Sequence, residues 1–122
     1  MDDIFFFDTY AFFEIVRASN NYEQYLKANI ITTKLNLFEL YHGLIKEIDE
    51  STANIILDKY YNLIIDFDKE TIQKAAQFKL ENKKRNLSMT DCIGYITSLK
   101  LGIKFLTGDK EFENFENVEF VK

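Results

Sequence analysis

The stretch Ile4–Thr9, which reads IFFFDT, decides the fold class of this chain. Its apolar part is long enough for one buried strand, and buried parallel strands read as continuous apolar runs. The run ends at Asp8 and Thr9, and the amphipathic segment Tyr10–Val16 follows at once. Ligands of open α/β sheets bind outside the carboxyl ends of such strands, which makes Asp8 a candidate functional residue. Asp is also among the best helix N-caps, so a purely structural role for Asp8 is the alternative.

Apolar runs and amphipathic segments alternate along the rest of the chain. This order predicts a mainly parallel sheet with helices on both faces, formed by one domain that spans residues 1–122. The predicted strands are Ile4–Phe7, Asn29–Thr33, Leu63–Ile65, Ile103–Leu106 and Val118–Val121. The predicted helices are Thr9–Ala18, Leu35–Ile48, Ser51–Tyr61 (with a Ser51 cap), Lys69–Arg85 and Thr90–Leu101, with helical turns at Tyr22–Lys27 and near Lys110–Phe115.

The composition narrows the chemistry of any site. Nearly half of the residues (47%) are apolar and 16% are aromatic, which indicates a packed core. A single cysteine, Cys92, excludes an internal disulfide and a cysteine-based zinc site, and one histidine, His42, leaves little for a histidine-rich site. We expect His42 to be structural or on the surface, and Cys92 to be a small core residue.

The charge and the ends of the chain bear on partners and location. The net charge of −5 argues against general electrostatic attraction to nucleic acid or to anionic membranes. It does not exclude a nuclease, because carboxylates that are neutralised by bound metal present a cation to the substrate. No signal peptide and no membrane span are expected, since no basic segment precedes the first apolar run and no apolar stretch approaches ~20 residues. We therefore expect a cytoplasmic protein.

Four acids occupy similar positions in the predicted topology. Asp8 ends the first strand, Glu39 lies about a turn into the helix after the second, Asp91 begins the helix Thr90–Leu101, and Asp109 follows the strand Ile103–Leu106. In a doubly wound sheet these positions share one edge. Converging carboxylates raise each other's pKa, and a divalent cation is the natural compensation. Ligands that are all oxygen favour Mg²⁺ or Mn²⁺ over Zn²⁺.

Each acid has a structural interpretation when it is taken alone. Asp91 fits a capping box with Ser88, and Asp109 is a possible cap for the last helical turn. Glu39 lies opposite the centre of the apolar stripe of its helix, so periodicity alone predicts a solvated side chain.

The acids and their flanking residues together resemble a known family. The segments are Phe7–Ala11 (FDTYA), Leu37–Gly43 (LFELYHG), Leu87–Gly94 (LSMTDCIG) and Leu106–Phe112 (LTGDKEF). They resemble the four acidic motifs of PIN-domain nucleases, whose small single-domain members are the VapC-type toxins of toxin–antitoxin pairs. The resemblance covers essentially the whole chain and implies a three-layer α/β/α sandwich around a central mainly parallel sheet.

The resemblance also implies a site. The first three acids of the family correspond to Asp8, Glu39 and Asp91, and the more variable fourth corresponds to Asp109, with Thr107 as the neighbouring hydroxyl. All four acids would be catalytic residues and ligands of Mg²⁺ or Mn²⁺. Where the family usually has small, alanine-rich residues after the third acid, this chain has Cys92 and Gly94.

The activity that follows is a metal-dependent endoribonuclease whose activated water leaves a 5′-phosphate and a 3′-hydroxyl on RNA. The implied partners are a cognate antitoxin, with a helix in an apolar groove near Phe12, Phe13 and Tyr41, and a second copy of the chain bound through the C-terminal half. The basic run Lys83–Arg85 is either a solvated helix end or a phosphate contact. The non-enzymatic alternative is a degenerate PIN fold that serves only as an interaction module.

Two other phosphate chemistries of the same fold class fit less well. A receiver domain needs an acidic pair after the first strand, and here the pair precedes that strand. A phosphatase of the haloacid dehalogenase type needs a second Asp two residues after the first, where this chain has Tyr10.

Overall fold

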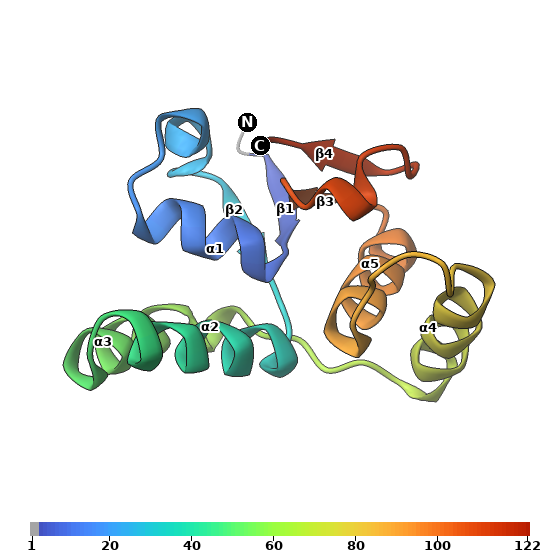
Figure 1. Ribbon diagram of the computed structural model, residues 1–122, viewed down its shortest axis with the longest axis horizontal. Coiled ribbons are helices and arrows are strands. Elements are labelled where there is room, and N and C mark those ends of the chain that lie inside the picture. Colours follow the sequence, from blue (N-terminus) through green and yellow to red (C-terminus); the bar gives the residue numbers. More distant parts are fainter. Residues whose placement is uncertain (1–2) are drawn as a thin grey trace.

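The computed structural model describes residues 3–122 and contains a four-stranded sheet. The strands lie in the upper middle of the view in Figure 1. All neighbouring strands are parallel, in the order β2-β1-β3-β4. The strands are β1 (Ile4–Phe7), β2 (Asn29–Ile31), β3 (Lys104–Thr107) and β4 (Val118–Phe120). The α-helices are α1 (Thr9–Val16), α2 (Lys34–Glu47), α3 (Glu50–Tyr60), α4 (Lys69–Glu81) and α5 (Met89–Leu101), and the 3₁₀ helices are η1 (Asn20–Tyr25), η2 (Tyr61–Leu63) and η3 (Lys110–Phe112).

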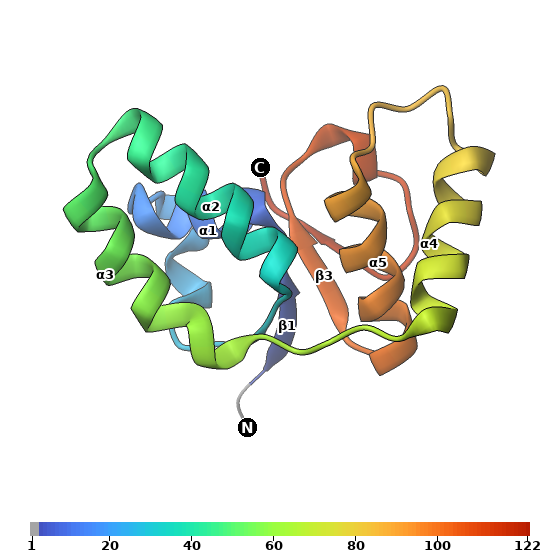
Figure 2. The same ribbon diagram turned by 90° about the horizontal axis from the view of Figure 1, so that it is seen from below.

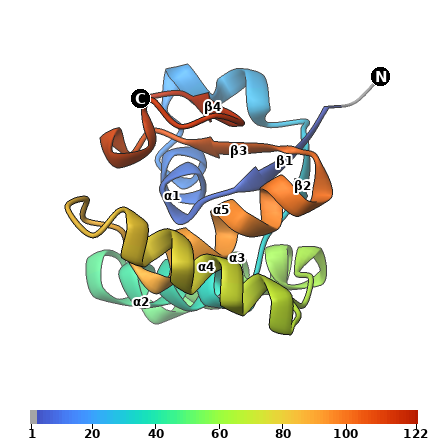
Figure 3. The ribbon, with the colours of Figure 1, turned by 90° about the vertical axis from the view of Figure 1, so that its right-hand side faces the viewer.

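The helices cover both faces of the sheet, which confirms the predicted α/β/α sandwich. In Figure 2 the α2–α3 pair and the α4–α5 pair lie on opposite sides of β1 and β3, and Figure 3 views the molecule from the side of α4 and α5. No helix among the described residues is long and apolar enough to cross a membrane.

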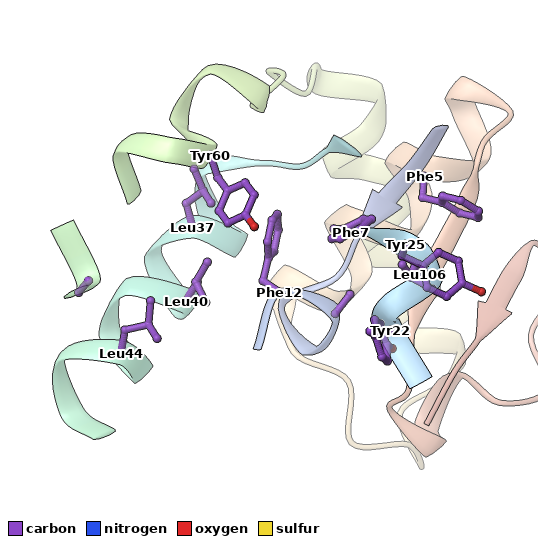
Figure 4. Packing of buried hydrophobic residues seen from close by; sticks show 12 residues of the cluster. Phe5, Phe7, Phe12, Tyr22, Tyr25, Leu37, Leu40, Leu44, Tyr60 and Leu106 are labelled. Carbon is purple, nitrogen blue, oxygen red and sulfur yellow. The ribbon is translucent and has the colours of Figure 1, made fainter. Parts of the chain in front are cut away.

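The alternation of side chains along β1 builds both layers of the core. Phe5 and Phe7 face α1, α2 and η1, whereas Phe6 faces α5, because successive residues of a strand point to opposite faces. In the first layer Phe12 lies between Phe7 and Tyr60, with ring centroids 5.3 and 4.8 Å away (Figure 4). Burial of aromatic side chains on both faces holds β1 in the middle of the sheet.

In the second layer the ring of Phe6 stacks on that of Phe105 at 5.6 Å, and α5 crosses over both. A Cβ on Gly94 would lie 2.8 Å from the Phe6 ring. Gly94 therefore departs from the family pattern for a packing reason, since two large rings on the strands require a residue without a side chain on the helix above them.

Two predicted elements differ from the structure. Leu63–Ile65 is not a strand, because it pairs only through the single bridge between Ile64 and Thr32. Just beyond Thr32 the chain turns into α2, with Thr33 as its N-cap, so no extended neighbour is left to pair with. The predicted helix Lys69–Arg85 ends at Glu81, where the side chain of Asn82 donates to the Phe78 carbonyl. The other boundaries agree with the prediction to within two residues, apart from the short turns; α3 is capped by Asp49 instead of Ser51.

Candidate active site

Asp8 directly follows β1, at the carboxyl end of a strand that pairs with β2 on one side and with β3 on the other. Its backbone N–H donates to the Leu106 carbonyl of β3 at 3.1 Å, and its side chain is 3% exposed. Asp8 occupies the N-cap position of α1, yet its carboxylate makes no capping hydrogen bond. Oδ2 accepts a hydrogen bond from the Thr107 hydroxyl at 2.7 Å, and Oδ1 is buried without a partner among the described residues. The capping interpretation of Asp8 is therefore wrong.

Thr107 connects the first acid with the fourth. Its hydroxyl donates to Asp8 and accepts from the backbone N–H of Asp109 at 3.1 Å. The carboxylate of Asp109 accepts from the Glu111 N–H at 3.0 Å and so caps η3 as the sequence suggested. Because β1 and β3 are adjacent and parallel, their carboxyl ends lie side by side, and residues 99 positions apart along the chain meet there.

Asp91 has a capping role at the start of α5. Its Oδ2 accepts from the Ser88 N–H at 2.9 Å, and the Ser88 hydroxyl accepts from the Asp91 N–H at 3.0 Å, which completes the predicted capping box. The capping box therefore fixes the Asp91 carboxylate at the N-terminus of α5, the end of that helix that favours negative charge.

Glu39 is half-buried, so the solvated position that periodicity predicts is wrong. One of its oxygens, Oε1, accepts from the Thr9 hydroxyl at 2.8 Å. Thr9 is the residue directly after Asp8, and this contact draws the second acid to the edge where the first lies. The helical wheel could not reveal the contact, because it reports the packing of α2 on the core and not the approach of α1 to its flank.

All four acids line one open cleft of about 600 Å³. Burial, and next the charge of Asp91, raise the pKa of Asp8 to about 8, although the Thr107 hydrogen bond opposes the rise. Burial is also the main cause that raises the pKa of Asp91 to about 6, with contributions from the charges of Asp109 and Glu39. The carboxylates therefore interact electrostatically across the cleft. Within residues 3–122, however, no three of them are grouped closely enough to form a ready set of metal ligands.

Lys79 of α4 is a cleft residue that the sequence analysis did not propose. Among the described residues that line the cleft it is the single basic side chain, and its ammonium group donates to the Leu87 carbonyl. The signal was its place among Ile72, Ala75 and Ala76 on the apolar side of the helix. A lysine in such a stripe buries its stem and extends its charge beyond the apolar surface.

The basic run Lys83–Arg85 is exposed and lies in the loop directly after α4, so its predicted solvation is confirmed, although the run lies just beyond the helix. It does not line the cleft, which counts against the phosphate contact. Arg85 stacks over the ring of Phe115 at 4.6 Å and donates to the Glu111 carbonyl at 2.7 Å. Two of the minor predictions are confirmed: His42 is exposed and stacks on Phe38, and Cys92 is a buried core residue.

The apolar groove near Phe12, Phe13 and Tyr41 stays a prediction, and Phe12 itself cannot line it. Phe12 is fully buried in the core, the Phe13 ring lies against Gly43, and the Tyr41 hydroxyl donates to Asn54 at 2.8 Å. A separate, nearly apolar groove of about 340 Å³ lies between α4 and α5. It is lined by Leu35, Phe67, Ile72, Ala75, Ala76, Lys79, Met89, Cys92 and Ile93.

Comparisons with known proteins identify the fold. Among curated proteins none matches the chain. VapC20 of Mycobacterium tuberculosis, described as a sarcin–ricin loop cleaving toxin, is 15% identical with a TM-score of 0.78, over 97% of this chain and 99% of that one. DNA-bound VapBC from Salmonella typhimurium is 17% identical with a TM-score of 0.74, over 98% and 97%. A toxin–antitoxin complex from Klebsiella pneumoniae is 20% identical with a TM-score of 0.72, over 93% of each chain.

The likeness at these identities concerns the fold, and the sequence supplies the family. The PIN domain family matches residues 5–118, nearly the whole chain, and that match includes the four acids of the cleft. This chain is a member of the PIN domain family.

Proposed function

We propose that this protein is a metal-dependent endoribonuclease and the toxin of a toxin–antitoxin pair. The observation that carries the proposal is the state of Asp8, a buried carboxylate whose Oδ1 has no hydrogen-bond partner among the described residues and whose neighbours in the cleft are also acids. An unpaired buried oxygen destabilises a fold, and so does a cluster of like charges. A purely structural domain gains nothing from such an arrangement.

The donor set fits Mg²⁺ or Mn²⁺. The described residues of the cleft include the carboxylates of Asp8, Glu39, Asp91 and Asp109 and no histidine or cysteine. Asp8, with its free oxygen, Asp91 and Asp109 would hold the ion, and Glu39 would contribute directly or through water. When bound, such an ion neutralises the carboxylates, polarises a phosphate oxygen and lowers the pKa of a water.

The side chains of the cleft divide the remaining work. The Thr107 hydroxyl holds Asp8 through Oδ2 and leaves Oδ1 without a hydrogen-bond partner among the described residues. Glu39, with Oε1 occupied by Thr9, has its second oxygen available to orient the attacking water. Lys79 places a positive charge beside the acids, where the phosphate of an RNA strand would bind. In-line attack on phosphorus would expel the 3′ oxygen and leave a 5′-phosphate and a 3′-hydroxyl.

The partners follow from the relatives. VapBC and toxin–antitoxin complexes are among the solved structures with this fold, which supports a cognate antitoxin for this chain. We propose in addition a homodimer that forms through the C-terminal half. Docking on an apolar surface is the expected mode, and light scattering of the purified protein with and without the product of the adjacent reading frame measures both interactions.

The alternative is an interaction module without catalysis. The observation that favours it is that, within residues 3–122, no three acids are grouped as ready metal ligands. The two functions differ in their response to metal, because only the nuclease needs the acids as ligands.

The decisive experiment compares the unaltered protein with Asp8→Asn and with Asp66→Asn, an exposed control that does not line the cleft. Mn²⁺ should raise the melting temperature of the unaltered protein and of the control, as any ligand of the native state does, and should have little effect on Asp8→Asn. RNA cleavage in Mn²⁺ should fall by about 100-fold or more in Asp8→Asn with unchanged circular dichroism. If Asp8→Asn cleaves RNA as fast as the unaltered protein, the proposal is wrong.

A further inference from the structure

Asn36, in the first turn of α2, has a fully buried polar side chain. Its Oδ1 accepts from the Thr33 hydroxyl at 2.7 Å, and its Nδ2 donates to the Thr9 hydroxyl at 3.2 Å. The second contact crosses from α2 to α1 and ends on the residue that follows Asp8.

The donor–acceptor pattern fixes the direction of the Thr9 hydroxyl. The amide nitrogen of Asn36 can only donate, so the Thr9 oxygen accepts that bond. The hydroxyl proton is then left for Glu39 Oε1, which accepts it at 2.8 Å. The chain of hydrogen bonds thus runs from the Asn36 amide through Thr9 to the Glu39 carboxylate, with the Thr33 hydroxyl holding the amide in place.

The network occupies one oxygen of Glu39 and leaves the other for the cleft. Asn36 and Glu39 lie three residues apart, one turn of the same helix, and both reach the hydroxyl of Thr9. The rotamer of Glu39 is thereby tied to a buried group instead of to solvent, although Glu39 itself lines the open cleft. Among the described residues no hydrogen bond to its Oε2 is present.

Core packing does not require an amide at this position. Leu37 and Leu40, the apolar neighbours of Asn36 on α2, are also buried, and a leucine at position 36 would extend the same surface. Burial of an amide carries a desolvation cost that an apolar residue of similar volume avoids. A polar group that is retained in the core under those conditions points to a role in the site that it supports.

We propose that Asn36 is a positioning residue: it orients the Thr9 hydroxyl so that Glu39 presents its free oxygen to the substrate side of the cleft. The inference rests on the proposed nuclease function. Hydrogen-bonding partners behind the groups that contact a metal or a substrate commonly change activity by about 10–100-fold. Because Asn36 acts through Thr9, loss of either residue should have the same consequence, and loss of both should add little.

The test is a double-mutant cycle on the full chain, with Asn36→Leu, Thr9→Val and the double variant. We expect kcat for RNA cleavage at saturating Mn²⁺ to fall about tenfold in each variant, with KM within about twofold of the original. The double variant should be no slower than the slower single variant. Thr9→Ser, which keeps the hydroxyl, should have a kcat close to that of the unaltered protein. Thr97→Val is the matched control, because it removes a buried hydroxyl that only bonds within α5.

A second measurement does not depend on activity. In metal-free protein the ¹³Cδ resonance of the Glu39 carboxylate should move in Asn36→Leu and in Thr9→Val, and should stay in place in Thr97→Val. If the unaltered protein cleaves no RNA while the resonance moves as expected, the nuclease proposal fails, and only the orientation of Glu39 by Asn36 through Thr9 stands. Additive losses of kcat in the double variant, or a Glu39 resonance that ignores Asn36→Leu, would overturn the inference.

Discussion

Replacement of Asp8 by Asn should stabilise the metal-free protein above about pH 5 while RNA cleavage falls by about 100-fold or more. The folded state raises the pKa of Asp8 from 3.8 to about 8, mainly because the carboxyl is buried and next because Asp91 is charged. The folded protein therefore keeps a proton that the unfolded chain releases. A group of this kind stabilises the fold fully only below pH ~4, and the stability is lost as pH rises toward 8.

The magnitude follows from that window. Each pH unit between the unfolded and folded pKa values corresponds to about 1.4 kcal/mol, so the penalty from Asp8 is roughly 2 kcal/mol at pH 5 and roughly 5 kcal/mol at pH 8. An amide at this position keeps the Thr107 hydrogen bond but leaves an N–H group unpaired, at a cost of about 1–3 kcal/mol. Asp8→Asn should therefore match the unaltered protein near pH 5 and exceed its stability at pH 8 by roughly 2–4 kcal/mol.

Urea unfolding in EDTA at pH 5, 6, 7 and 8, followed by circular dichroism, measures the difference directly. The amide cost is the same at every pH, so the gain in the free energy of unfolding of Asp8→Asn over the unaltered protein should grow by roughly 3–4 kcal/mol between pH 5 and pH 8. Asp66→Asn should leave the pH dependence as it is in the unaltered protein. A difference that stays constant with pH would refute the assignment of Asp8 as a carboxyl that the fold keeps protonated.

Two further predictions concern the cleft cation and the second core layer. Lys79→Met, which keeps the apolar stem, should weaken RNA binding about fivefold and reduce the salt dependence of binding, with little change in kcat. Lys84→Met in the exposed loop should change neither the affinity nor its salt dependence. Equal salt dependence in both variants would exclude the phosphate contact. Gly94→Ala should destabilise the fold by about 1–3 kcal/mol in urea unfolding, because its Cβ would meet the Phe6 ring at 2.8 Å. Phe6→Leu added to Gly94→Ala should recover part of the lost stability. A double variant that is no more stable than Gly94→Ala would contradict the packing argument.

The amino-acid sequence determined the fold class and the edge of the sheet where the acids lie. The apolar run Ile4–Phe7 has the length of a buried strand. A strand that is followed directly by a helix places Asp8 at the carboxyl end of the strand, independently of the rest of the chain. The capping box around Asp91 is also local, because Ser88 and Asp91 are separated by one helical turn. Features that depend on backbone geometry over a few residues can be predicted from the sequence.

The tertiary structure alone decided which groups meet in the cleft. Periodicity places Glu39 in solvent, and only the approach of α1 to α2 brings the Thr9 hydroxyl to its carboxylate. The same packing buries Asn36, and the pairing of β1 with β3 brings Thr107 to Asp8 across 99 positions. The strand that the sequence suggested at Leu63–Ile65 does not form, because a strand needs a neighbouring strand to pair with as well as apolar residues. Hydrogen bonds between distant segments depend on how helices and strands pack, and a period along one element carries no information about its partner.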